Sequence, residues 1–361
     1  MKYKIYTLGD LVKIKYGKNQ KKVQSDDGAI PIYGTGGLMG FANAALYDKP
    51  SVLIGRKGTI NKVRYVDHPF WTVDTLFYTE VNDDIVVPKY LYYIMSLLDL
   101  DAYNEGTTIP SLRTETLNRL EFRIPDIQYQ KKVLSMLSPI DHKITINNKI
   151  NENLQEQAQA LYTNMFVQNT SDQWAEGVLS DVAEIIMGQS PRGDTYNEDG
   201  EGTVFFQGRG EFGFRFPTRR LFTTDPKRMA QPNDVLMSVR APVGDLNVAY
   251  ESCCIGRGLG AIRSKDNHQS FVLYTVFSLR EKLDMFNSEG TVFGSINRDA
   301  LNSMPIVIPT KEEVNQFEEI VAPMDAAIRN NYEEICRLEA IRDSLLPRLL
   351  SGELDVSELD L

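Results

Sequence analysis

The sequence contains few cysteines and no long apolar run. Its 361 residues include three cysteines, which offer no metal-ligand spacing, so we expect Cys253, Cys254 and Cys336 to be buried small apolar residues in a reducing compartment. No run of roughly 18 apolar residues occurs, and the N-terminal residues lack the apolar stretch of a signal peptide. The composition therefore predicts a cytoplasmic protein that does not contact a membrane.

Common catalytic and nucleotide-binding motifs are also absent from the sequence. It has no GxxxxGK[ST] loop, no GxSxG turn and no Asn-Pro-Pro-aromatic motif of adenine methylation, and its three histidines lack ligand spacing. Gly208, Gly210 and Gly213 match a dinucleotide-binding pattern, but the Phe-Arg-Phe-Pro that follows cannot open the helix that would hold a pyrophosphate. We therefore predict no catalytic residues, no metal and no cofactor bound by this chain.

Positive charge is scarce overall but unevenly distributed. The net charge of −10 argues, taken alone, against a general nucleic-acid binder. Between positions 11 and 64, however, ten lysines and arginines face three aspartates, whereas the tail at 352–361 carries four acidic residues and no base. The acidity is thus partly separated from the first part of the chain.

What the sequence does contain is a pair of long amphipathic helices, predicted at 125–167 and 309–351. Apolar residues recur at steps of three and four, interrupted by asparagines, which is typical of a coiled-coil seam. Asp126 is a candidate N-cap of the first helix, and Thr310 with Glu313 forms a candidate capping box for the second. Roughly 40 residues at about 1.5 Å each span on the order of 60 Å, so we expect a spacer. The residues expected to pair the helices are Leu137, Ile140, Ile144, Asn147, Leu154, Leu161, Met324, Ile328, Asn331, Ile335, Leu338 and Leu345.

The chain repeats itself over about half its length. Asn147 corresponds to Asn331 and Leu154 to Leu338, each pair 184 positions apart, as 331 is from 147. Two segments of α+β pattern, at 1–124 and 179–308, precede the two helices, and a polar linker at 168–178 separates the halves. Within the first segment, residues 88–100 are predicted to form a helix. The middle of each segment, 18–49 and 189–228, differs between the halves, as expected when one scaffold meets two partners.

A series of motifs occurs twice in the same order. The residues are Gly106-Thr-Thr-x-Pro-Ser-Leu-Arg, Leu117, Ile124-Pro125 and Gln130 in the first copy, Gly290-Thr-x-x-x-Ser-Ile, Leu301, Ile308-Pro309 and Gln316 in the second, and Leu349 to Leu354 at the close of the second long helix. With these motifs in this order, the sequence resembles the specificity subunit of a Type I restriction–modification enzyme over essentially its full length.

The resemblance implies a fold, a function and partners. The two segments would be target recognition domains that read the halves of a split, asymmetric site in double-stranded DNA, and the helices would pair as an antiparallel coiled coil. The chain would have no enzymatic activity of its own. It would hold two adenine-methyltransferase subunits, which bind S-adenosylmethionine, together with ATP-dependent restriction subunits, and the long helices suggest a homodimer when those partners are absent.

Basic and polar loop residues are the natural candidates for DNA contact, because phosphates position a protein and base edges specify sequence. Each lysine and arginine among them has an alternative as a solvated charge or an ion pair with a carboxylate. The candidates are Lys18, Lys21, Tyr33, Arg56, Lys57, Lys62 and Arg113 in the first segment, and Arg192, Gln207, Arg209, Arg215, Arg219, Arg220, Arg240 and Arg257 in the second.

Two other functions remain compatible with the sequence. The acidic balance suits a coiled-coil scaffold or adaptor protein that does not bind DNA, and a specificity subunit without surviving partners would have the same sequence features. Tyr129, Tyr162 and Tyr332 on the helices either face partner subunits or pack on the globular segments.

Overall fold

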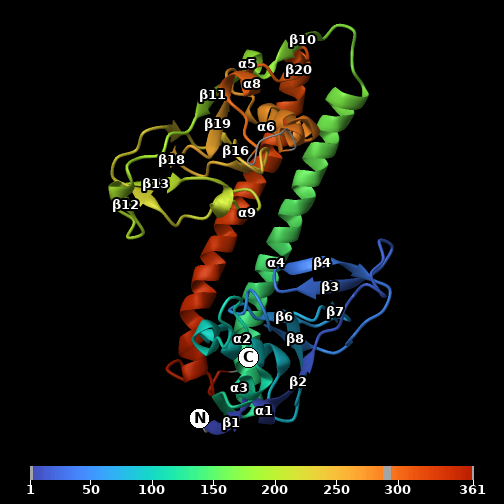
Figure 1. Ribbon diagram of the computed structural model, residues 1–361, viewed down its shortest axis with the longest axis vertical. Coiled ribbons are helices and arrows are strands. Elements are labelled where there is room, and N and C mark those ends of the chain that lie inside the picture. The colour runs from blue at the N-terminus through green and yellow to red at the C-terminus, as the bar shows by residue number, and fades with distance from the viewer. Residues whose placement is uncertain (1–2, 288–293, 360–361) are drawn as a thin grey trace. The chain divides into compact units, whose positions relative to one another are not determined.

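The computed structural model describes residues 3–287 and 294–359 (Figure 1). The chain divides into two units, Met1–Ile146 with Glu334–Leu361 and Asn147–Glu333. Two long helices, α4 (Ile127–Thr163) and α9 (Lys311–Ser351), each contribute residues to both units. Each unit therefore consists of one globular segment and half of each long helix.

The first unit is built on a four-stranded sheet in the order β2-β8-β5-β6. Thr7 caps the short helix that precedes β2, since Thr7 N donates to Asp10 Oδ2 at 2.8 Å and Asp10 N to Thr7 Oγ1 at 3.3 Å. Strands β1 and β9 pair separately beside it. The bounds are β1 (Tyr3–Thr7), α1 (Leu8–Leu11), β2 (Val12–Tyr16), β5 (Ser51–Gly55), β6 (Arg64–Val66), β8 (Leu76–Val81), α2 (Pro88–Ser96), α3 (Thr114–Asn118) and β9 (Glu121–Pro125).

The second unit repeats this plan element by element. Its four-stranded sheet runs β11-β19-β16-β17, and β10 pairs with β20 as β1 pairs with β9. The bounds are β10 (Ala175–Val178), α5 (Leu179–Val182), β11 (Ala183–Met187), β16 (Val235–Ser238), β17 (Leu246–Val248), β19 (Leu259–Ser264), α6 (Gln269–Ser278), α7 (Arg280–Asp284), α8 (Arg298–Asn302) and β20 (Pro305–Ile308). The predicted mixed α+β fold with an internal repeat is thus confirmed.

The middle of each unit keeps one pairing and otherwise differs. Strand β3 (Ile30–Gly34) lies parallel to β7 (Trp71–Thr72), and β13 (Thr203–Phe206) lies parallel to β18 (Cys253–Ile255). In the first unit β3 forms a hairpin with β4 (Gly37–Ala42). In the second, β12 (Tyr196–Asn197), β14 (Phe222–Thr223) and β15 (Met229–Ala230) complete a five-stranded sheet.

The hydrophobic core of each unit includes side chains of both long helices. In the second unit Ala158 and Tyr162 of α4 share a buried cluster with Phe317 and Val321 of α9 and with the sheet strands. In the first unit Val133 and Leu137 of α4 join Leu346 and Leu349 of α9 around the sheet and α2. A globular segment therefore cannot slide along its helices without exposing core side chains to water.

The contacts between α4 and α9 show that the two helices are antiparallel within each unit. In the second unit Asn331 Nδ2 donates to Asn151 Oδ1 at 2.8 Å, and the ring centroids of Tyr162 and Phe317 lie 5.7 Å apart. In the first unit Asp141 and Arg342 form an ion pair at 3.5 Å, and the Tyr129 hydroxyl donates to the Leu349 carbonyl at 3.3 Å. As the residue numbers rise along α4, those of the contacting residues on α9 fall.

Of the residues expected to pair the helices, five are fully buried and the others half-buried. Tyr129 and Tyr162 are also buried, so they pack inside the units. The buried residues from that set are Leu137, Ile144, Asn147, Ile328 and Ile335.

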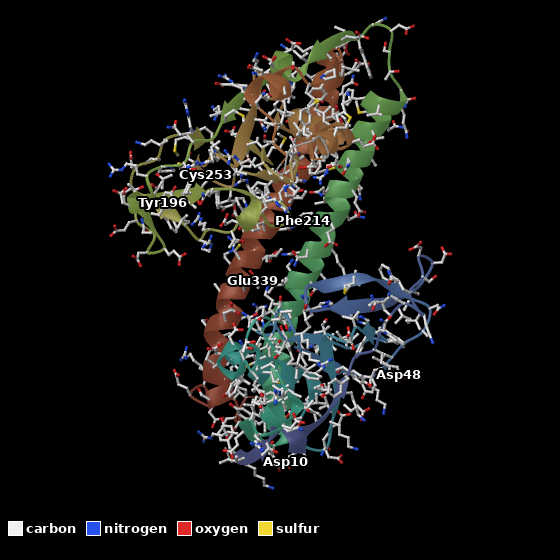
Figure 2. All side chains as sticks on the ribbon, viewed as in Figure 1. Asp10, Asp48, Tyr196, Phe214, Cys253 and Glu339 are labelled. Atoms are coloured by element: carbon white, nitrogen blue, oxygen red, sulfur yellow. The ribbon has the colours of Figure 1, made fainter. Side chains whose placement is uncertain are left out.

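Four sequence predictions need correction. The last part of the predicted linker is not irregular, because Ala175–Val178 form β10, whose partner β20 lies about 130 residues away in sequence. Helix α4 ends at Thr163 and is followed by a π-helical turn, Asn164–Gln168. Cys253, labelled in Figure 2, and Cys254 are buried, but Cys336 of α9 is exposed. The predicted helix caps are confirmed, since Tyr129 N donates to Asp126 Oδ1 and Thr310 and Glu313 form the capping box.

The fourth correction concerns the helix predicted to run from 88 to 100. Helix α2 ends at Ser96, and a separate 3-10 turn follows at Leu100–Tyr103. The motif residues Gly290 and Thr291 lie outside the described residues.

Because α9 contributes to the core, we expect substitutions at a buried and at an exposed position of this helix to differ strongly in their effect on stability. Phe317→Ala removes a fully buried ring that touches Tyr162, Phe166 and Phe271, so we expect it to lower the free energy of unfolding by about 3–5 kcal/mol. Ile320→Ala, at a side chain that is 49% exposed on the same helix, should change it by no more than about 0.5 kcal/mol. Urea unfolding of the two variants measures both. Equal losses of unfolding free energy would contradict the assignment of Phe317, and not Ile320, to the face of α9 that packs in the core.

Candidate nucleic-acid interface

A short basic turn follows β5, one of the two inner strands of the four-stranded sheet in the first unit. Strand β5 leads directly into Arg56 and Lys57, and Lys57 forms a β-bridge with Ser111. Leu112 N donates to the Arg56 carbonyl at 3.0 Å, and Gly58 N donates to the Pro110 carbonyl at 2.9 Å. These backbone bonds fix where the two basic side chains begin.

The same turn occurs in the second unit. Arg240 follows β16 and forms a β-bridge with Ser295, and Ile296 N donates to the Val239 carbonyl at 3.0 Å. Arg240 and Arg257 together line a hollow of about 310 Å³ with Ser295 and Asn297. The two units thus present basic side chains at equivalent positions of the repeat, next to polar Ser and Asn groups.

Glycines allow the chain to pass close to the sheet beside these turns. A Cβ on Gly17 would lie 2.0 Å from the Val73 carbonyl oxygen, and one on Gly188 would lie 2.1 Å from the Gly256 carbonyl oxygen. No side chain fits at either position. Lys18 and Gln189, which follow these glycines, are held by backbone bonds to Thr72 and Ile255.

The candidate cations fall into two groups by their neighbours. The first group has no carboxylate within ion-pair distance among the described residues. Arg56 instead donates to the Asp74 carbonyl at 3.0 Å and lies 5.1 Å from the centroid of the Tyr16 ring, and Arg257 donates to Ser190 Oγ at 3.4 Å. The members of this group are Lys18, Lys21, Arg56, Lys57, Lys62, Arg240 and Arg257.

The second group is ion-paired within its own unit. Arg113 lies 3.2 Å from Glu105, Arg192 2.7 Å from Asp194 and Arg219 2.5 Å from Glu251. Arg220 lies 2.7 Å from Glu211 and 3.2 Å from Glu198, and Arg209 pairs with Asp245. These side chains are exposed, so such pairs contribute little to stability and can exchange a carboxylate for a phosphate.

Three candidates differ from the rest. Arg215 is 5% exposed and lies in the interior against Asp325, so its side chain would have to leave that partner to touch DNA. Tyr33 bonds through its hydroxyl to His68 Nε2 at 3.1 Å, and burial raises the pKa of its phenol, so it stays protonated at neutral pH. Gln207 is exposed immediately after β13.

The structure also places residues at this surface that sequence reasoning did not nominate. His68 joins Tyr33, and Trp71 Nε1 donates to the Lys18 carbonyl at 2.8 Å. Arg64 lies against Gly37, where an added Cβ would be 3.3 Å from its Nη2. The parallel pairing of β3 with β7 places Trp71 beside Ile32 and Thr72 beside Tyr33, and the sequence of neither strand predicts that pairing.

Other kinds of site were sought in the parts of the chain that the structure describes. Those residues include no group of three or more His, Cys, Asp or Glu side chains placed to hold a metal ion. None of the helices found there is long and apolar enough to cross a membrane. Burial raises the pKa of the Cys253 thiol to about 12, which leaves it an inert core group.

Comparison with known proteins decides the family. The model of the Type I restriction modification DNA specificity domain matches residues 1–156 and again residues 171–340. The chain belongs to this family. Its members are specificity subunits, which are non-catalytic and recognise DNA sequence, so family membership favours DNA recognition over the adaptor alternative.

Individual relatives agree with this assignment. The chain is 29% identical over 304 residues to a protein of Methanocaldococcus jannaschii described as the MjaX specificity subunit of a type I restriction enzyme, covering 76% of this chain and 70% of that protein. It is 24% identical over 376 aligned positions to the HindI specificity subunit of Haemophilus influenzae, covering 79% and 81%. The crystal structure of a Type I S subunit from M. genitalium superposes with a TM-score of 0.62 at 16% identity, covering 97% and 96%, which supports the fold.

The basic turn of the second unit is open to a direct test. Arg240→Gln removes an exposed cation without breaking an ion pair, so we expect weaker binding of the specific duplex and a salt dependence of log K reduced by about one unit of slope if Arg240 contacts phosphate. If Arg240 contacts a base edge, discrimination at one position falls by about 1–3 kcal/mol instead. Fluorescence anisotropy against salt concentration distinguishes the two.

The matched control is Lys311→Gln, at an exposed lysine in the first turn of α9 in the same unit. It removes the same charge away from the turn and should leave affinity and salt slope nearly unchanged. Equal effects of the two variants would mean that overall charge, and not the turn, governs binding.

Proposed function

We propose that this specificity subunit reads a bipartite, asymmetric site in double-stranded DNA, one half with each unit. The observation that carries the proposal is the repeat itself. The sheet order and the basic turn recur in both units, whereas the segments 18–49 and 189–228 fold differently. A common frame with different loops suits two unlike half-sites, because base-edge contacts depend on which side chains the loops present.

The long helices would set the separation of the half-sites by pairing as an antiparallel coiled coil. The opposed contacts within each unit and the buried seam residues support this pairing. Asn147 and Asn151 are almost fully buried in a seam of apolar residues, where polar groups fix helix register at some cost in stability. Such a helix pair is stiffer than a flexible linker of equal length, which a fixed gap requires.

The helices would also dock two adenine-methyltransferase subunits, with restriction subunits joining the complex. Four isoleucines on α4 and α9 are more than one third exposed, which is uncommon for large apolar side chains on long helices and suits contact with partner subunits. Without those partners the same surface favours a homodimer. S-adenosylmethionine and ATP would be bound by the partner subunits. The exposed residues are Ile146, Ile150, Ile320 and Ile341.

Domain exchange tests the bipartite reading. Residues 1–124 are replaced by the corresponding segment of a relative with a different target, and genomic adenine methylation is mapped in cells that express the chain with its methyltransferase. One half of the methylated motif should change while the other half and the gap stay the same. Replacement of residues 179–308 should change the opposite half, and a single swap that alters both halves would contradict the proposal.

A further inference from the structure

The segment 208–220 of the second unit presents two opposite faces. Arg209, Phe214, Arg219 and Arg220 are exposed. Between them Arg215 and Phe216 are only 5% and 4% exposed. A β-bridge between Phe212 and Pro217 closes this loop. The candidate DNA contacts are therefore carried on a loop whose centre is buried in its own unit.

The centre of the loop is attached to helix α9 by a buried charge. Arg215 Nη1 lies 3.3 Å from Asp325 Oδ1, and Arg215 Nη2 donates to the Tyr274 hydroxyl at 3.0 Å. That hydroxyl in turn donates to Asp325 Oδ1 at 3.1 Å. A buried guanidinium that loses its carboxylate is left uncompensated, so this triangle holds the loop in one place.

A second residue of α9, Arg329, contacts the loop through the aromatic ring of Phe216. Arg329 donates to the Tyr250 carbonyl at 2.9 Å and to Asn233 Oδ1 at 2.6 Å. Its guanidinium carbon lies 5.0 Å from the centroid of Phe216 and 4.7 Å from that of Tyr250. Phe216 also packs on Tyr332 of α9, with ring centroids 4.9 Å apart.

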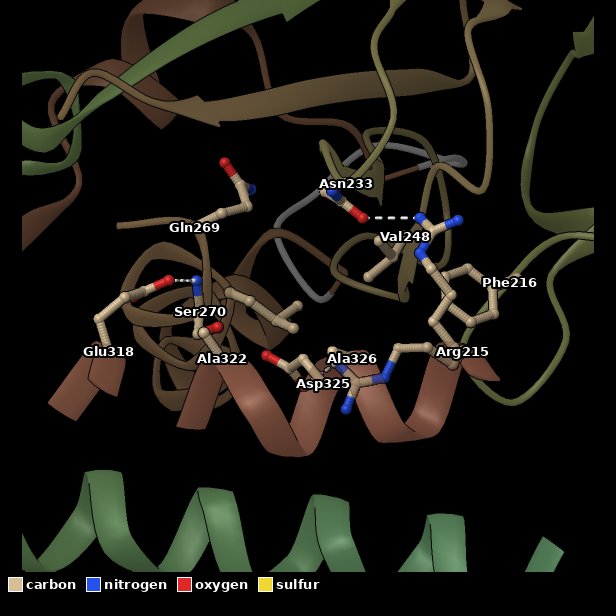
Figure 3. A pocket seen from close by; sticks show the side chains of 12 residues that line it. Arg215, Phe216, Asn233, Val248, Gln269, Ser270, Glu318, Ala322, Asp325 and Ala326 are labelled. Atoms are coloured by element: carbon tan, nitrogen blue, oxygen red, sulfur yellow. Dashed lines mark hydrogen bonds and ion pairs between the residues drawn. The ribbon is translucent and has the colours of Figure 1, made fainter. Parts of the chain in front are cut away.

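Next to these contacts the loop is not packed tightly against the helix. A cavity of about 260 Å³ opens beside Arg215 and Phe216, and small side chains of α9, Ala322 and Ala326, line it (Figure 3). Close packing therefore does not restrain the loop on that side. The contacts with Asp325, Arg329 and Tyr332 hold it from the helix side. Two hydrogen bonds from β17 hold its backbone, because Val248 N donates to the Arg215 carbonyl and Asn247 Nδ2 to the Gly213 carbonyl, each at 2.8 Å.

The first unit lacks this attachment. Asp141 is the repeat equivalent of Asp325 and likewise accepts from a tyrosine, Tyr93, at 2.5 Å. Its cationic partners are Lys89 of α2 at 3.2 Å and Arg342 of α9 at 3.5 Å. Neither comes from the variable segment 18–49, so the aspartate holds the frame in the first unit and the variable loop in the second.

We propose that Asp325, Arg329 and Tyr332 of α9 are positioning residues for sequence recognition by the second unit. They hold the 208–220 loop where Arg209, Phe214, Arg219 and Arg220 meet DNA, although they do not touch DNA themselves. The proposal rests on the proposed reading of one half-site by each unit. Because a base-edge hydrogen bond needs a donor and acceptor about 3 Å apart, a displaced loop loses discrimination before it loses general affinity.

The test uses the assembled complex of the full chain with its methyltransferase. Arg329→Gln removes the cation above Phe216 and Tyr250. We expect discrimination against single base changes in the second half-site to fall about tenfold, with discrimination in the first half-site unchanged. The measurement is the rate of adenine methylation on duplexes that carry one base change in either half. Arg329→Lys keeps the charge but loses the planar guanidinium that reaches the Tyr250 carbonyl and Asn233 together, and should give an intermediate loss.

Two matched variants serve as controls. Lys311→Gln removes an exposed cation from the same helix and should leave both half-sites unchanged. Asp141→Asn alters the equivalent aspartate of the first unit and should leave the second half-site unchanged. Thermal melting and complex assembly are followed for every variant, and Arg329→Lys provides the readout if Arg329→Gln does not assemble.

The outcomes separate this proposal from the function on which it rests. Unchanged discrimination in Arg329→Gln, or an equal loss in both half-sites, overturns the positioning role. If exchange of residues 179–308 changes neither half-site, the bipartite reading itself fails. If that exchange changes the second half-site while Arg329→Gln and Arg329→Lys both discriminate normally, only the positioning role fails.

Discussion

Burial of both long helices in the core of each unit is the constraint on which the rest of the structure depends. Phe317 and Val321 of α9 and Tyr162 of α4 lie in one cluster with the sheet of the second unit, and Leu137 and Leu349 do the same in the first. Because the helix residues belong to the core, a sheet could change its orientation on its helix segments only by breaking that core. The free-energy cost of breaking the core keeps the orientation fixed. A rigid frame of this kind lets exposed loops differ freely.

The repeat is also visible in single polar interactions. Tyr93 donates to Asp141 and Tyr274 to Asp325, and in each case a buried tyrosine beside the sheet meets an aspartate of a long helix. Burial raises the pKa of both tyrosines, so both hydroxyls remain donors at neutral pH. The cation that completes each site comes from a different part of the unit. The two units thus share the tyrosine–aspartate pair and differ in the cation beside it.

Much of the fold could be predicted from the sequence because its signals are local. The spacing of apolar residues, the Ile-Pro pairs and the Thr310 capping box mark the helices. Strand β10 is not predicted from the sequence, because it forms by pairing with β20, which is distant in sequence. Arg215 was nominated as a surface cation because its partner Asp325 follows 110 positions later, and the outward placement of Cys336 depends on which helix face meets the core. The contacts with DNA stay predictions.

A change in helix length tests whether the helices set the spacing of the recognised site. One helical turn of four residues is inserted into α4 and into α9 near Asn147 and Asn331, which adds about 6 Å to each helix. The methylated motif in cells should keep both half-sites and gain a gap longer by about two base pairs, at about 3.4 Å each. Methylation of the original motif with an unchanged gap would contradict the account.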